Sequence, residues 1–195
     1  MKSLFILIAA LFPFLGFTGQ KTHWIQEHID VYPDFPKPGI LFQSVMPLIR
    51  NPEAFEKVTQ EFADRYQGQK IDAILGLEAR GFIFGTALAQ KLKVPFIPVR
   101  KSGKLPGKVI KTAYQKEYGS DSFEIEVGAL KKGDTVVIID DLIATGGTAI
   151  AACDLAARSG ATVAEVACLV ELPFLKAREK LPCPLFTLLE VDIDE

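Results

Sequence analysis

The sequence contains few of the residues that usually hold a structural metal. It has three cysteines, Cys153, Cys168 and Cys183, and only two histidines, His23 and His28. The cysteines are odd in number and far apart, and no C-x-x-C pair occurs, so a zinc site is not indicated. We expect buried free thiols in a reducing compartment.

The common nucleotide-binding loops are missing too. No G-x-x-x-x-G-K-[ST] sequence occurs, and its nearest imitation, from Gly103 to Lys108, has the wrong spacing and continues with Val109. No G-x-G-x-x-G sequence occurs either, which argues against a classical dinucleotide site. A formal net charge of −2 gives no overall attraction to nucleic acid. The sequence has no repeats, and its length of 195 residues fits one folded domain.

The first twenty residues form a distinct apolar leader. Residues 4–17 carry no charge and follow a short cationic start, as in a secretory signal, but no A-x-A cleavage site occurs. The apolar stretch is shorter than the roughly 20 residues that span a bilayer, so we expect no stable membrane span. An export signal, a retained extension and a start codon assigned too early all remain open. Residues 21–195 are predicted to form the single domain.

The most informative stretch is residues 136–148. A continuous apolar run ends in Asp140 and Asp141, and a loop of small residues and an alanine-rich helical segment follow. Such a run is typical of a strand buried on both faces of a parallel sheet. Ligands of these sheets bind just beyond the carboxyl ends of the strands. The acidic pair and the loop are therefore predicted to form a binding site.

The rest of the chain supports an α/β fold. Apolar runs at residues 71–76 and 95–99 alternate with helical stretches. Asn51 followed by Pro52 marks the start of a helix, since asparagine caps helices and proline is tolerated in the first turn. We predict a doubly wound, mostly parallel sheet.

The residues of the loop indicate the kind of ligand. Gly146 and Gly147 have no Cβ, so their backbone amides can surround an oxyanion. Thr145 and Thr148 add hydroxyl donors, and the helix that follows points its positive end at the same place. The carboxylates of the acidic pair would repel a phosphate but suit hydroxyl groups. A ribose 5-phosphate fits both parts, whereas the alternative is an ordinary strand-turn-helix with exposed acids.

These residues also carry a family resemblance. Residues 140–148 (DDLIATGGT) resemble the phosphoribosyl-pyrophosphate signature of the type I phosphoribosyltransferases. Three other segments resemble the adenine phosphoribosyltransferase family: residues 32–42 its N-terminal hood, 75–82 its pyrophosphate loop, and 99–107 with 117–119 its mobile flap. The likeness runs in one register from about residue 24 to residue 190. It implies the type I fold with a small hood, at about residues 22–45, and a flexible flap, at about 101–122.

The resemblance implies a complete site for adenine, phosphoribosyl pyrophosphate, AMP and pyrophosphate. Glu117 would take the proton of the base, and Arg80 would meet the pyrophosphate. Mg²⁺ would bind mainly through the substrate, near the acidic pair, with no direct protein ligand. The implied substrate-binding residues are Leu41, Phe42, Gln43, Arg80, Arg100, Lys101, Lys104, Tyr118, Asp140, Asp141, Ala144, Thr145, Gly146, Gly147 and Thr148.

Taken without the resemblance, several of these residues have ordinary explanations. Arg80 can be a surface arginine, the cations after residue 99 a solvated basic turn, and Glu117 one of many acids that face water. Phe42 can be a core residue that follows a proline-rich connector. A resemblance in one continuous register favours the functional interpretation of all of them together.

One departure from the family pattern keeps alternatives open. The family commonly has Phe-Arg-Asp where this chain has Phe42, Gln43 and Ser44. A phosphoribosyltransferase for another base therefore remains an alternative. A non-catalytic regulator that binds phosphoribosyl pyrophosphate is a second one, although no effector module is recognisable. The resemblance also implies a homodimer and a cytoplasmic setting.

Overall fold

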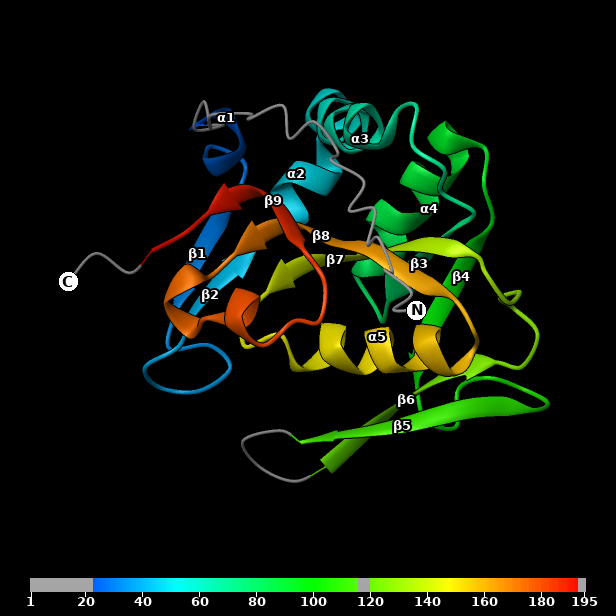
Figure 1. Ribbon diagram of the computed structural model, residues 1–195. Helices are drawn as coiled ribbons and strands as arrows, with labels where there is room; N and C mark the ends of the chain where they lie inside the picture. The colour runs from blue at the N-terminus through cyan, green and yellow to red at the C-terminus, as the bar shows by residue number, and fades with distance from the viewer. Residues whose placement is uncertain (1–22, 116–119, 193–195) are drawn as a thin grey trace, which may run out of the picture.

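A seven-stranded sheet forms the centre of the protein (Figure 1). The computed structural model describes residues 23–115 and 120–192. In spatial order the strands are β5 (Val109–Gln115), β6 (Ser120–Glu126), β4 (Phe96–Lys101), β3 (Ala73–Leu77), β7 (Thr135–Ile143), β8 (Thr162–Glu171) and β9 (Leu185–Glu190). Strands β4, β3, β7, β8 and β9 pair in parallel, whereas β6 pairs antiparallel with both β4 and β5. The prediction of a mostly parallel sheet is confirmed.

Helices cover both faces of the sheet, as the doubly wound prediction requires. One face carries α2 (Met46–Arg50), α3 (Pro52–Tyr66) and α4 (Gly81–Leu92), and the other carries α5 (Gly147–Arg158) (Figure 1). The remaining helical turns are α1 (His23–Gln26), η1 (Pro173–Leu175) and η2 (Ala177–Glu179). Among the residues described, no helix is both long enough and apolar enough to cross a bilayer.

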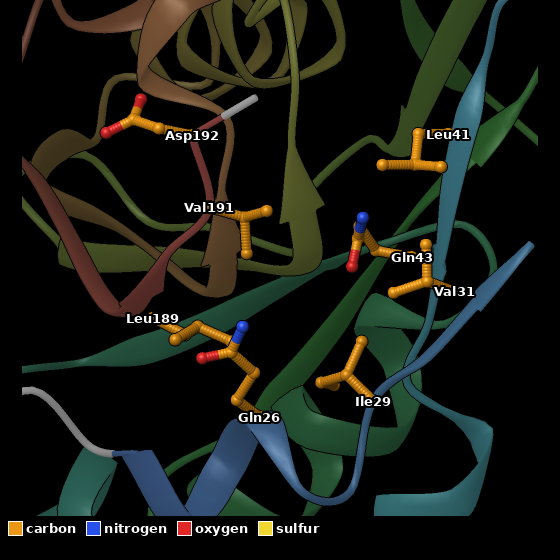
Figure 2. A pocket seen from close by; sticks show the side chains of 8 residues that line it. All are labelled: Gln26, Ile29, Val31, Leu41, Gln43, Leu189, Val191 and Asp192. Carbon is orange, nitrogen blue, oxygen red and sulfur yellow. The ribbon is translucent and has the colours of Figure 1, made fainter. Parts of the chain in front are cut away.

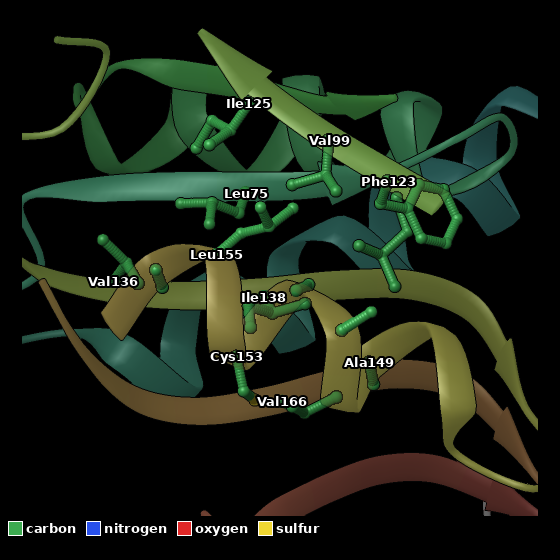
Figure 3. Packing of buried hydrophobic residues seen from close by; sticks show 14 of the residues in the cluster. Leu75, Val99, Phe123, Ile125, Val136, Ile138, Ala149, Cys153, Leu155 and Val166 are labelled. Carbon is green, nitrogen blue, oxygen red and sulfur yellow. The ribbon is translucent and has the colours of Figure 1, made fainter. Parts of the chain in front are cut away.

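Strand β7 shows why its apolar run is continuous. Successive side chains of a strand point to opposite faces of a sheet. Val136 and Ile138 pack in the cluster beneath α5 (Figure 3), and Val137 and Ile139 pack in the cluster beneath α3 and α4. All four side chains are fully buried, so each face needs an apolar residue at every second position.

Helix α3 begins where the sequence predicted. The Asn51 side chain accepts hydrogen bonds from the backbone N–H groups of Glu53 and Ala54, both at 3.1 Å, and Pro52 occupies the first turn. The cap thus satisfies two of the donors that a helix N-terminus leaves unpaired. Val58 and Phe62, from the same face of the helix, lie in the core.

The predicted hood contains a small hairpin outside the main sheet. Strands β1 (Asp30–Pro33) and β2 (Leu41–Ser44) pair antiparallel, with Tyr32 opposite Phe42. The hairpin lies beside the C-terminal end of β9 (Figure 1). The predicted flap, at about residues 101–122, overlaps the β5–β6 hairpin, which runs from Val109 to Glu126. The centre of the flap, with Glu117 and Tyr118, and the leader of residues 1–20 lie outside the described residues.

Candidate active site

The acidic pair lies near the carboxyl end of β7, at the centre of the sheet. Strand β7 continues to Ile143, so the pair belongs to the strand and does not follow it. Asp140 and Asp141 are both buried. Burial raises the pKa of Asp140, and the neighbouring Asp141 carboxylate raises that pKa further. The site therefore holds two carboxyl groups in surroundings that disfavour a double negative charge.

Arg80 supplies the counter-charge for this pair. Its guanidinium forms an ion pair with the Asp141 carboxylate, across 61 positions of sequence. Arg80 is the residue before the first turn of α4, directly after the loop that leaves β3. Its side chain is 45% exposed, so the guanidinium stays hydrated while it pairs with a buried carboxylate. The structure thus brings Arg80 to the acidic pair, a contact that the sequence did not predict.

Gly81 allows the close approach of α4 to β7 that this ion pair requires. A Cβ atom at Gly81 would lie 2.6 Å from the carbonyl oxygen of Ile139 and 3.0 Å from Oδ1 of Asp140. The first distance is far shorter than van der Waals contact, and its partner is backbone that cannot move aside. A residue without a Cβ is therefore needed beside Arg80.

The segment from Ala144 to Thr148 contains the turn after β7 and the first two residues of α5. Gly146 adopts a left-handed conformation, with φ of 83°, and caps the helix. A Cβ there would lie 3.2 Å from the Cβ of Ala177, so both conformation and space favour glycine. The loop ends at the N-terminus of a twelve-residue helix, whose first N–H groups and dipole favour an anion. Thr145 is exposed and Thr148 half-buried, next to those groups.

The hood strand β2 presents two different faces. Phe42 lies on the site side: the Arg80 guanidinium is 5.7 Å from its ring centroid, and Phe35 packs edge-on at 5.1 Å. Leu41 and Gln43 point instead toward Leu189 and Val191 and line a separate pocket of about 300 Å³ behind the hood (Figure 2). The Gln43 side chain is 5% exposed. The side chains of Leu41 and Gln43 thus lie on the opposite face from Phe42.

The predicted pyrophosphate cations divide into two kinds. Arg100 is already engaged: its Nε lies 3.3 Å from Oε2 of Glu78, and its Nη1 donates to the carbonyl of Lys104 at 3.1 Å. The Glu78 carboxylate also accepts the backbone N–H of Lys101 at 2.9 Å. The side chains of Lys101 and Lys104 are exposed. These two lysines are therefore better placed than Arg100 to meet an incoming anion.

Sequence reasoning missed Glu124, which fixes the base of the flap. Its buried carboxylate accepts the backbone N–H groups of Lys104 and Leu105, both at 2.8 Å, and lies 3.3 Å from the Lys111 ammonium. Burial alone would raise the pKa of Glu124, but the N–H donors of residues 103–105 and Lys111 outweigh it and lower the pKa from 4.5 to about 2. A buried glutamate in a strand is a weak sequence signal, because its partners become neighbours only in the fold.

Replacing Glu124 with glutamine should loosen the base of the flap. The amide presents a single acceptor oxygen and no charge, so we expect a loss of about 1–3 kcal/mol in the free energy of unfolding. Because the folded pKa lies below the ordinary value, this stabilisation is complete above about pH 4.5 and disappears as the pH falls through about 2. Denaturant unfolding at several pH values measures the difference between wild type and variant.

The matched control for this prediction is Glu126→Gln, which changes an exposed glutamate of the same strand. It should leave the free energy of unfolding within about 0.5 kcal/mol of wild type. If Glu124→Gln were no more destabilising than this control at neutral pH, the anchoring role of Glu124 would be wrong.

Among the described residues, no group of three or more His, Cys, Asp or Glu side chains is arranged to hold a metal. The acidic pair offers two carboxyl groups, which are oxygen donors of the type that Mg²⁺ prefers. One of them, Asp141, is already paired with Arg80.

Comparison with known proteins defines the class. The family model described as "Phosphoribosyl transferase domain" matches residues 47–186, which is more than half of the chain. The match contains the acidic pair, the loop of residues 144–148 and Arg80. The chain thus contains a phosphoribosyl transferase domain, and the acidic pair lies within it.

Individual relatives narrow the class. Adenine phosphoribosyltransferase of Eremothecium gossypii is 50% identical over 163 residues, which cover 82% of this chain and 87% of the relative. The structure of adenine phosphoribosyltransferase from Saccharomyces cerevisiae, complexed with an imino-altritol bisphosphate and adenine, is 48% identical with a TM-score of 0.83, covering 86% of this chain and 97% of that one. The enzyme from Trypanosoma brucei, in complex with AMP, pyrophosphate and ribose-5-phosphate, is 34% identical with a TM-score of 0.82, covering 90% and 82%. This chain belongs to the adenine phosphoribosyltransferase family.

Proposed function

We propose that the protein transfers the phosphoribosyl group of phosphoribosyl pyrophosphate to N9 of adenine, which yields AMP and pyrophosphate, a purine-salvage reaction. The observation that carries the proposal is the convergence of Arg80, Phe42 and the buried acidic pair beside the loop of residues 144–148, in a chain of this family. The loop suits a 5-phosphate, the acids suit a ribose, and the Phe42 ring suits a flat base.

The acidic pair would act on the ribose. The bond from ribose C1 to pyrophosphate breaks as the base attacks, so positive charge develops on the sugar ring. The carboxyl group of Asp140, whose pKa is raised by burial and by Asp141, would form a hydrogen bond with a ribose hydroxyl. The Asp141 carboxylate, held by Arg80, accepts one and places negative charge near the ring.

The adenine would lie against the Phe42 ring. Aromatic rings stack on flat heterocycles, and the guanidinium of Arg80 lies over the same ring. The hood backbone at Leu41 and Gln43 would read the edge of the base, because the side chains of both residues turn into the pocket behind the hood. This arrangement would allow glutamine at position 43, since a backbone contact does not depend on the side chain.

The leaving pyrophosphate would be met by cations from two elements. Lys101 and Lys104 at the base of the flap are exposed, and Arg80 borders the acidic pair. Mg²⁺, bound mainly through the substrate and near Asp140 and Asp141, would neutralise phosphate charge. Arg100 would hold the segment with Lys101 and Lys104 in place through its contacts with Glu78 and the Lys104 carbonyl.

Glu117, outside the described residues, is proposed as the acceptor of the adenine N9 proton. Replacing it with glutamine should lower kcat by about 10²-fold and change the KM for phosphoribosyl pyrophosphate much less, since general-base catalysis contributes to the transition state. The low-pH limb of the wild-type kcat profile should vanish in the variant. Steady-state kinetics from pH 5 to 9 test this, and equal kcat values in the two proteins would refute a proton-transfer role.

Product analysis tests the proposed reaction and its two alternatives. The purified protein would be given phosphoribosyl pyrophosphate, Mg²⁺ and an equal mixture of adenine, hypoxanthine, guanine and orotate. AMP as the sole nucleotide is the expected product. A different nucleotide would assign the protein to another base. Tight binding of phosphoribosyl pyrophosphate without any nucleotide would favour the non-catalytic regulator.

The assembly and compartment belong to the proposal as well. Family likeness supports a homodimer, which sedimentation velocity at micromolar concentration would detect. We propose the cytoplasm as the compartment, because a reducing environment suits the three free cysteines. N-terminal sequencing of the protein recovered from its native cells would show whether the leader of residues 1–20 is removed.

A further inference from the structure

Two of the three cysteines meet in the fold, although 30 positions separate them in sequence. The Sγ atoms of Cys153 and Cys183 lie 3.7 Å apart. Cys153 belongs to α5, where its side chain lies in the cluster beneath the helix (Figure 3), and Cys183 lies in the segment that enters β9. The third cysteine, Cys168, is fully buried in β8. All three thiols are free, but the prediction that they are buried holds only for Cys153 and Cys168, because Cys183 is half-buried.

The two members of the pair differ in exposure and in acidity. Cys183 is half-buried between the exposed Pro182 and Pro184, whereas Cys153 is 5% exposed. The hydrogen bond from Cys153 lowers the pKa of Cys183, and the backbone N–H of Val166 lowers it as well, against burial and the Glu165 charge. The same hydrogen bond and burial raise the pKa of Cys153. Cys183 is therefore the more accessible thiol and the one that ionises first.

We propose that Cys183 and Cys153 are a reactive thiol pair that a low-molecular-weight disulfide, such as glutathione disulfide, converts into an intramolecular disulfide bond. The Cys183 thiolate attacks one sulfur of glutathione disulfide, whose S–S bond breaks and releases one glutathione thiolate. Cys153 then gives up its proton to that thiolate and attacks the Cys183 sulfur, which releases the second glutathione. Two protein thiols are oxidised, and one glutathione disulfide is reduced to two thiols.

The geometry of the pair makes the second step intramolecular. A disulfide bond is about 2.0 Å long, so the two sulfur atoms need to approach by about 1.7 Å from their separation of 3.7 Å. Cys183 lies in a segment without regular structure between η2 and β9, where such a shift is least opposed.

The disulfide bond would link α5 to the segment between η2 and β9. The N-terminus of α5 carries Gly146 and Gly147, and Ala177 of η2 already packs against Gly146. A bond from Cys153 to Cys183 would link the same helix to the segment that follows η2. The oxidation chemistry itself does not depend on the proposed transfer reaction.

The sequence offers a direct way to map the bond. Cleavage after lysine and arginine places Cys153 in peptide 133–158, Cys168 in peptide 159–176 and Cys183 in peptide 181–195. The full-length protein would be reduced, freed of reductant and incubated with excess glutathione disulfide. Thiols would be titrated in denaturant, and unreduced peptides identified by mass spectrometry. We expect one remaining thiol and a covalent link between peptides 133–158 and 181–195.

Thermal unfolding gives an independent readout on the same samples. A disulfide that closes a loop of this length restricts the unfolded chain, so the oxidised protein should unfold at a temperature higher by about 5 °C or more. Dithiothreitol should restore three thiols and the original midpoint. Retention of all three thiols, a stable glutathione adduct on Cys183, or a link to the peptide with Cys168 would each overturn the proposal.

Three single variants separate the roles of the thiols. Cys153→Ser should accumulate a glutathione adduct on Cys183, because the resolving thiol is missing. Cys183→Ser should keep its two remaining thiols, because both are buried. Cys168→Ser is the matched control and should still form the disulfide. Loss of the Cys153 thiol in Cys183→Ser at the wild-type rate would contradict the assignment of Cys183 as the attacking residue.

Discussion

Replacing Asp141 with alanine is expected to lower kcat/KM for AMP formation by at least about 10²-fold, while the protein remains folded. The variant loses both the hydrogen-bond acceptor for the ribose and the negative charge that would stabilise the transition state. It also releases the Arg80 guanidinium, which Asp141 holds in place. Because Arg80 is 45% exposed, its freed charge stays hydrated, and the cost in stability should be small.

Initial rates with adenine and phosphoribosyl pyrophosphate would measure this loss, with denaturant unfolding on the same samples. Asp154→Ala is the matched control, because Asp154 is a 48% exposed aspartate on α5, outside the proposed site. The control should keep wild-type kinetics. Wild-type activity in Asp141→Ala would remove this residue from the site.

The parts of the fold that depend on local patterns could be predicted from sequence. The apolar run before Asp140 identifies β7, and Asn51 with Pro52 identifies the start of α3. These features follow from side-chain period and helix capping, which act over a few residues. The start of α5 was predictable for the same reason, since Gly146 caps this helix and Gly147 is its first residue.

Contacts between distant segments could not be predicted in this way. The ion pair of Arg80 with Asp141 depends on how closely α4 approaches β7, which Gly81 permits. The anchoring of residues 104 and 105 by Glu124 depends on the pairing of β6 with β4. In both contacts, neither residue indicates its partner from the sequence alone, because partners that are far apart along the chain share no periodic pattern.

In the hood, the family pattern predicted a group of residues but not the direction in which their side chains point. The resemblance grouped Leu41, Phe42 and Gln43 as substrate-binding. In the structure, side chains alternate between the two faces of the strand. Phe42 therefore points toward Arg80, and Leu41 and Gln43 line the pocket behind the hood. Leu41 and Gln43 are therefore proposed to contact the base through their backbone, and the roles of all three residues remain predictions.

Replacing Arg80 with alanine should affect both activity and stability. The Asp141 carboxylate would stay buried beside Asp140 without its counter-charge. We expect kcat/KM to fall by about 10²- to 10³-fold, and the free energy of unfolding by about 1–2 kcal/mol after allowance for the exposure of Arg80. Arg80 lowers the pKa of Asp140, so its loss raises that pKa further. The stability deficit should therefore be largest at high pH and shrink as the acids take up protons.

The conservative variant Arg80→Lys and a double-mutant cycle separate charge from geometry. Lysine keeps the positive charge but loses the planar fork, so it should recover most of the lost stability and only part of the lost activity. The double variant Arg80→Ala with Asp141→Ala should lose far less kcat/KM, on a logarithmic scale, than the two single variants lose together. Each single change already breaks the same ion pair. Additive losses would mean that Arg80 and Asp141 act independently on the substrate. The ion pair would then be a feature of the free enzyme that substrate binding breaks.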